Sequence, residues 1–188
     1  VAYKDVANGN KATVMKYDGS AWVPVGTAGF SAGTADYTSL ALDSNNVPYV
    51  AYMDVANGNK ATVMKYDSGS GWVPVGSAGF SAGAVDDTSL ALDSSGVPYV
   101  AYKDVANGNK ATVMKYDSGS AWVPVGSAGF SAGAADYTSL ALDSSGVPYV
   151  AYRDGANGDK ATVMKYDGSA WVPVGSAGFS AGGAYFTS

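Results

Sequence analysis

The feature that most constrains this chain is a repeat of 49 or 50 residues that runs along its whole length. The tripeptide Val-Ala-Tyr recurs at residues 1–3, 50–52, 100–102 and 150–152. The four tryptophans keep the same period, at Trp22, Trp72, Trp122 and Trp171. Near-identical copies at such a period are typical of a solenoid, a propeller or an array, in which each unit buries its apolar face against its neighbours.

One copy contains four short segments with the composition of strands. Residues 88–93 alternate in polarity, residues 98–102 begin with a proline, and residues 111–116 and 122–125 are apolar. The connecting segments carry turn chemistry, which includes Ser-Ser-Gly at 94–96 and Asn-Gly at 107–108, the strongest short-range signal for a hairpin. Proline in the last strand fits a sheet edge, because an inner strand needs that N–H.

These strands predict an all-β fold, a β-propeller of four-stranded antiparallel blades with about 50 residues per blade. Sustained helical periodicity is missing, so helical repeats are disfavoured, and a β-solenoid is the alternative. We expect one propeller, or a slice of one, divided at the first strand into 1–37, 38–87, 88–137 and 138–188. The first unit lacks its first strand and the last ends just inside a new one, so further repeats or another chain would complete the ring.

Composition excludes much chemistry. The chain has no Cys, His or Glu, and Arg153 is its single arginine. Thiol catalysis and a Ser-His-Asp triad are therefore excluded. The net charge of -5 is evenly spread and offers no basic patch, so we expect no nucleic-acid partner. No stretch is long and apolar enough to predict a membrane span.

Two resemblances support a propeller. Residues 89–104, Ser-Leu-Ala-Leu-Asp-Ser-Ser-Gly-Val-Pro-Tyr-Val-Ala-Tyr-Lys-Asp, resemble the core of NHL repeats. That resemblance implies a blade whose first strand is innermost. The turns at 67–72 and 117–122, with Asp, Gly and Trp in D-x-G-x-x-W spacing, resemble part of the Asp-box of sialidase-type propellers, where the box is a folding element. Sialidase activity itself is not expected, because that family uses three Arg and a Tyr–Glu pair.

We expect no cofactor. Calcium is the one metal considered, because Asp54, Asn57 and Asn59 offer oxygen atoms within one loop and the set recurs in the next copy. However, Lys60 follows directly and no acidic residue closes the loop, whereas calcium takes six to eight oxygen ligands. The Asn-Gly turn already accounts for these residues.

Positions that differ between the copies are the candidates for specificity. On the propeller hypothesis they lie on one face, formed by the loops between the second and third strands and between the fourth strand and the next blade. The predicted ligand-binding residues are Lys4, Met53, Lys103, Arg153, Asp36, Tyr37, Asp86, Asp87, Asp136, Tyr137, Tyr185 and Phe186. The competing interpretation is drift at exposed loop positions.

The sequence thus favours a non-enzymatic binding or scaffolding propeller of a secreted or surface protein, with a carbohydrate or protein ligand. An engineered or recently duplicated structural repeat without a ligand is the alternative. A glycoside-active enzyme is the remote one, since aspartates could supply the two carboxylates that such chemistry needs.

Overall fold

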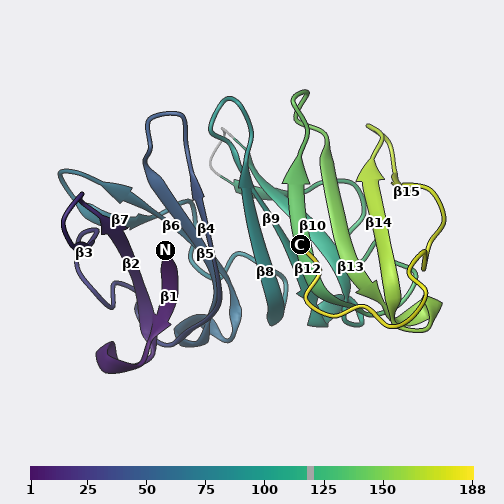
Figure 1. The fold of residues 1–188 in the computed structure, drawn as a ribbon, viewed down its shortest axis with the longest axis horizontal. Coiled ribbons are helices and arrows are strands. Elements are labelled where there is room, and N and C mark those ends of the chain that lie inside the picture. Colours follow the sequence, from purple (N-terminus) through teal and green to yellow (C-terminus); the bar gives the residue numbers. More distant parts are fainter. Residues whose placement is uncertain (118–120) are drawn as a thin grey trace.

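A computed structural model describes residues 1–117 and 121–188. In these residues the chain forms four antiparallel sheets that stand side by side in sequence order, from purple at the N-terminus to yellow at the C-terminus (Figure 1). The first sheet contains β1 (Ala2–Asp5), β2 (Lys11–Tyr17) and β3 (Trp22–Pro24). The second contains β4 (Ala35–Leu42), β5 (Pro48–Asp54), β6 (Lys60–Asp67) and β7 (Gly71–Pro74).

The third and fourth sheets repeat the second. The third contains β8 (Val85–Leu92), β9 (Pro98–Asp104), β10 (Lys110–Asp117) and β11 (Ala121–Pro124). The fourth contains β12 (Ala135–Leu142), β13 (Pro148–Asp154), β14 (Lys160–Tyr166) and β15 (Trp171–Pro173). Within each sheet, every strand pairs with the next one along the chain, so each sheet is a simple meander. The proline-containing last strands lie at sheet edges, as predicted.

The first strands of the sheets are innermost. β8 contacts both β4 and β12, whereas β7, β11 and β15 lie at the far edges of their sheets. These inner strands begin three residues earlier than expected, at Val85 rather than Thr88 in the third sheet. The early start includes a break in pairing that the polarity pattern did not reveal. The division of the chain at residues 37, 87 and 137 remains a proposal, and it falls inside these strands.

Neighbouring sheets are held together by an aromatic stack. Phe80 lies on Trp122 with ring centroids 4.0 Å apart, and Trp122 Nε1 donates a hydrogen bond of 2.8 Å to the carbonyl of Val75 in the preceding sheet. The same arrangement joins Phe30 with Trp72 and Phe130 with Trp171. Apolar residues therefore occur on both faces of each inner sheet, because each sheet is covered on both sides.

The recurring aspartate at the end of the second strand organises a turn. Asp104 accepts hydrogen bonds from the Thr112 hydroxyl at 2.8 Å and from the Asn107 amide at 2.8 Å, and it caps the 3-10 turn η3 (Val105–Asn107) through the N–H of Ala106. Equivalent turns are η1 (Val6–Asn8), η2 (Val55–Asn57) and η4 (Gly155–Asn157). These aspartates are buried and engaged within the chain, which accounts for their recurrence in every copy.

The loop considered for calcium is organised in the same way. The Asn57 amide and the Thr62 hydroxyl both donate to Asp54 Oδ2, whereas Asp54 Oδ1 is buried without a hydrogen bond among the described residues. One open carboxylate oxygen falls short of the six to eight oxygen ligands that calcium takes. Within the residues described, no group of three or more acidic residues could hold a metal ion.

The turn between the third and fourth strands is also built on an aspartate. Asp67 Oδ1 accepts the N–H groups of Gly69 and Ser70, and these bonds hold the pKa of Asp67 below its usual value. The corresponding predicted turn after Asp117 includes residues 118–120, which lie outside the described part of the chain.

Across the described residues, no helix has the length and apolar character needed to span a membrane.

Candidate functional site

The candidate site is built on an irregularity in the inner strands. Pairing shifts between residues 36 and 39 in β4, between 86 and 89 in β8, and between 136 and 139 in β12. One residue in each irregularity has a positive φ of 51° to 54°, and these residues are Tyr37, Asp87 and Tyr137. Phe186, at the same repeat position near the C-terminus, has a φ of 54°. Positive φ is rare for aromatic residues and costs about 1–3 kcal/mol, and such strain gathers at functional sites.

Contacts from the next sheet hold these strained residues in place. The hydroxyl of Thr88 donates to the carbonyl of Tyr37, and Thr138 donates to that of Asp87 in the same way. The N–H of Tyr137 donates to Asp87 Oδ2 at 2.7 Å. The strained positions are thus fixed by bonds between neighbouring sheets, which aligns their side chains along the line of inner strands.

Charged side chains from the second strands reach the same place. Asp136 forms ion pairs with Lys103 Nζ and Arg153 Nη1, each at 2.7 Å. Lys103 belongs to the preceding sheet. The hydrogen bond with Asp136 raises the pKa of Lys103. Lys4 Nζ, in the first sheet, likewise lies 2.6 Å from Asp36 Oδ1 in the second sheet. The lysines at this repeat position therefore pair with the aspartate of the next sheet, whereas Arg153 pairs with Asp136 of its own sheet.

Met53 interrupts this pattern. It occupies the position of Lys4 and Lys103, and it packs against the apolar core between the second and third sheets. Among the described residues, Asp86 and Asp87 consequently form no ion pair. Burial raises the pKa of Asp87, the N–H of Tyr137 opposes that shift, and the charges of Asp136 and Asp86 add to it.

Aromatic rings border the charged groups. Tyr137 lies 4.8 Å from Phe186 and 6.1 Å from Tyr185, measured between ring centroids. The guanidinium of Arg153 lies 5.2 Å from the centre of the Tyr185 ring. Tyr37, Tyr185 and Phe186 are exposed, so these rings are available to a ligand and are not part of the core between sheets.

A cavity of about 300 Å³ lies among these side chains. Its lining comes from three consecutive sheets and consists of Tyr37, Asp86, Asp87, Lys103, Asp136, Tyr137 and Arg153. The cavity therefore combines two carboxylates that form no ion pair, a group in which Lys103 and Arg153 share Asp136, and two tyrosine rings. Such a set recognises hydroxyl groups and flat apolar faces.

Every residue of this lining was predicted from the sequence. The other predicted residues do not line the cavity. Tyr185 and Phe186 contact Tyr137, Lys4 and Asp36 pair with each other, and Met53 packs against the core. Asp159 was missed, although it bonds Arg153 Nη2 at 2.7 Å. Its signal was visible, because the other copies have Asn at that position.

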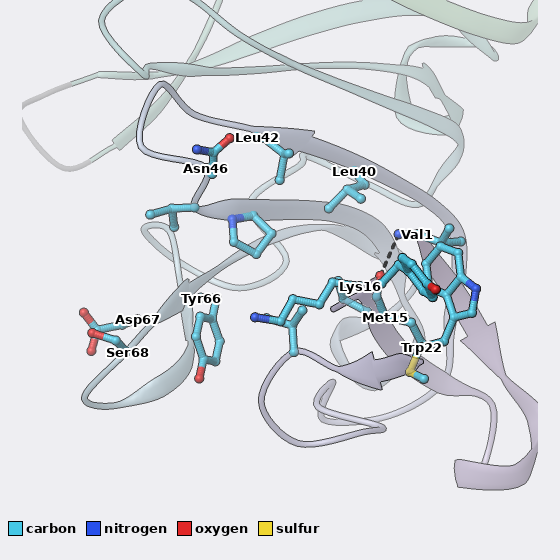
Figure 2. A pocket seen from close by; sticks show the side chains of 15 residues that line it. Val1, Met15, Lys16, Trp22, Leu40, Leu42, Asn46, Tyr66, Asp67 and Ser68 are labelled. Atoms are coloured by element: carbon cyan, nitrogen blue, oxygen red, sulfur yellow. Dashed lines mark hydrogen bonds between the residues drawn. The ribbon is translucent and has the colours of Figure 1, made fainter. Parts of the chain in front are cut away.

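Two further cavities lie in grooves between sheets. The larger, of about 670 Å³, runs between the first and second sheets. Figure 2 shows Val1, Met15 and Trp22 at one end of this groove and Tyr66, Asp67 and Ser68 at the other. An equivalent groove of about 490 Å³ separates the third and fourth sheets.

The fold and this arrangement of loops define an all-β propeller with about 50 residues per blade, as the sequence predicted. No family model matches the chain, and no curated protein sequence matches it. The resemblances to NHL repeats and to the Asp-box are therefore not confirmed.

Solved structures do share the fold. A fucose lectin from Kordia zhangzhouensis in complex with methyl-fucoside is 20% identical with a TM-score of 0.50, over 74% of this chain and 99% of that one. The Aleuria aurantia lectin in complex with Fucα1-6GlcNAc is 21% identical with a TM-score of 0.58, over 90% of this chain and 55% of the lectin. An ulvan lyase, a polysaccharide lyase, is 16% identical with a TM-score of 0.55, over 88% of this chain and 48% of the enzyme. At these identities the likeness establishes the fold, which lectins and enzymes share.

Proposed function

We propose that this chain is a non-enzymatic carbohydrate-binding propeller and that the sugar occupies the cavity between Tyr37 and Tyr137. The observation that carries the proposal is the pair Asp86 and Asp87, two carboxylates that form no ion pair among the described residues and that line a cavity bordered by tyrosines. Carboxylates accept hydrogen bonds from sugar hydroxyls, and tyrosine rings pack on the apolar face of a pyranose.

Preorganisation supports the proposal. The strained backbone at Tyr37, Asp87 and Tyr137 is fixed by hydrogen bonds from the next sheet, so the side chains that would meet the sugar need little ordering on binding. The solved lectins of this fold, crystallised with fucosides, give the proposal its first probe, methyl-fucoside. A secreted or surface location fits a glycan-binding protein and is part of the proposal.

A glycoside-active enzyme is the competing function. The specific observation in its favour is the raised pKa of Asp87 beside a second carboxylate, Asp86. Hydrolysis requires two carboxyl groups on opposite sides of the bond, at about 5–9.5 Å from each other. Asp86 and Asp87 are consecutive, and Asp136 is already engaged by Lys103 and Arg153, so binding is favoured over cleavage.

A glycan array tests the proposal with three variants. Asp86→Ala should abolish binding of the glycans that the wild type retains. Asp36→Ala is the matched control, because Asp36 occupies the same repeat position one sheet earlier and lies outside the cavity. Tyr66→Ala removes a ring from the groove in Figure 2 and should leave binding unchanged.

Two results would overturn the proposal. Loss of binding in Tyr66→Ala with retention in Asp86→Ala would move the site to the groove between sheets. Release of shorter sugars from a bound oligosaccharide, followed by chromatography, would make the protein an enzyme.

A further inference from the structure

The two end sheets expose opposite halves of the contact that joins neighbouring sheets inside the chain. Trp22 in β3 is 57% exposed, whereas Trp171, at the same repeat position, is 9% exposed beneath Phe130. At the other end Phe179 is 59% exposed, and within the described residues no ring stacks on it. Trp22 thus lacks a phenylalanine and Phe179 lacks a tryptophan.

The remaining parts of the contact divide in the same way. In each internal contact a tryptophan Nε1 donates to a valine carbonyl of the preceding sheet, at Val25, Val75 or Val125. Val174 is their counterpart in the fourth sheet, and it is 41% exposed where Val125 is 7% exposed. The first sheet supplies the matching donor in Trp22.

The space around one repeated glycine shows the same division between the two end sheets. A Cβ atom placed on Gly126 would lie 2.7 Å from the ring of Tyr166, because the next sheet packs directly against this backbone. Gly26 and Gly76 face tyrosines equally closely. At Gly175 nothing lies within 4 Å, while Tyr17, the counterpart of Tyr166, is exposed on the first sheet. The fourth sheet has the space and the first sheet has the ring.

We propose that the fourth sheet of one copy of this chain packs against the first sheet of a second copy and repeats the contact between internal sheets. The occupant is a second copy, because the two faces carry the matching halves of one contact that recurs three times within the chain. The new contact would stack Phe179 on Trp22 and pair Trp22 Nε1 with the carbonyl of Val174.

The C-terminal segment adds backbone pairing to this contact. The N–H of Ala184 donates to the carbonyl of Asp159, just as the N–H of Ala35 donates to the carbonyl of Asn10. Ala35 is the residue at which β4 begins to pair with β5. Among the described strands, β1 pairs with β2 alone. In the register of Ala35 with Asp54 and Asp36 with Met53, Ala184 and Tyr185 of one copy would pair with Asp5 and Lys4 of the second. The blade that begins with β1 would thereby gain an inner strand segment.

Such a contact is heterologous, since each copy uses a different face. It closes into a ring if the rotation between copies permits and otherwise continues into a longer assembly. In either case the mass in solution exceeds that of one chain, and both Trp22 and Phe179 become buried.

Sedimentation velocity over a wide range of protein concentration tests the proposal, with the 188-residue chain and two variants at exposed positions, Trp22→Ser and Phe179→Ser. The wild type should exceed 18.9 kDa as concentration rises, and each variant alone should remain at 18.9 kDa. A mixture of the two variants should form a species of twice that mass, because one variant retains the Phe179 face and the other retains the Trp22 face. Val105→Ser, at an exposed turn of an internal sheet, should assemble like the wild type.

A wild type that stays at the mass of one chain at every concentration would overturn the proposal. So would variants that assemble like the wild type, or a mixture of variants that remains at the mass of one chain. Circular dichroism of each variant verifies that its strands are intact, so that a lost assembly reports the contact and not the fold.

Discussion

Phe130 and Trp171 stack face to face, with ring centroids 4.0 Å apart and planes 8° from parallel, across the boundary between the third and fourth sheets. Trp171 also contacts Tyr166 within its own sheet, with ring centroids 5.8 Å apart and planes inclined by 51°. Each boundary thus contains a cluster of three rings, and such clusters carry large apolar areas. The stability of the propeller therefore depends on contacts between sheets more than on any single sheet.

Trp122→Ala should lower the free energy of unfolding by about 3 kcal/mol, because it removes a ring stacked on Phe80 and leaves the Val75 carbonyl without its donor. The matched control is Trp22→Ala, at the same repeat position but exposed, which should cost less than about 1 kcal/mol in dilute protein. Urea unfolding followed by circular dichroism measures both. Equal losses in the two variants would show that the boundary contact is not what stabilises the fold.

Asp104→Ala should destabilise the chain by about 2–3 kcal/mol, since it leaves the buried Thr112 hydroxyl and the Asn107 amide without their acceptor. Asp104→Asn retains one acceptor oxygen and should cost less. Thermal unfolding of the two variants checks the order. An Asn variant that unfolds earlier than the Ala variant would contradict the hydrogen-bond explanation.

Tyr37→Asn should stabilise the chain by about 1 kcal/mol while it weakens carbohydrate binding. Tyr37 has a φ of 51°, and asparagine adopts this conformation at lower cost than tyrosine. Tyr17→Asn, at an exposed strand position without positive φ, serves as the control and should give no gain. Chemical denaturation and binding assays on the same preparations measure the two effects. A loss of stability in Tyr37→Asn would contradict the claim that the backbone at Tyr37 is strained.

Asp87→Asn should become more stable relative to the wild type as pH rises. Because burial raises the pKa of Asp87 above the ordinary value of 3.8, the folded wild type holds this proton more tightly than the unfolded chain does. The free energy of unfolding of the wild type therefore falls as pH increases from 3.8 to the raised pKa, and the variant lacks this decrease. The difference between the two proteins should be smallest below pH 3.8 and constant above the raised pKa. Urea unfolding across this pH range measures it, and a difference that shrinks with pH would contradict the assigned direction.

The repeat made the fold predictable, because four copies of one pattern report the same strands and turns several times. The order of strands and the edge position of Pro124 both followed from residue type and spacing. The irregularity at Asp86 to Ser89 could not be predicted in this way. This segment contains no glycine, and the positive φ of Asp87 is held by a hydrogen bond from the neighbouring sheet.

The candidate site was predictable in its members but not in its connections. Comparison of the copies selected Lys103, Asp136 and Arg153, yet pairing of Lys103 with the aspartate of the next sheet depends on how the sheets are placed. The pairing of Asp159 with Arg153 likewise depends on the reach of Arg153 across the loop. The packing of Met53 against the core, at the repeat position from which Lys103 pairs with the aspartate of the next sheet, likewise appears only in three dimensions.

The most direct test of carbohydrate binding at the cavity is an NMR titration of the ¹⁵N-labelled chain with the glycan that binds most strongly on the array. Our account predicts that amide resonances of Asp86, Asp87 and Tyr137, together with the Arg153 side-chain N–H, shift with a common saturation curve. Resonances of Tyr66 and Asp67 in the groove between sheets should stay in place. Saturable shifts confined to Tyr66 and Asp67, or no saturable shift with any glycan, would contradict it.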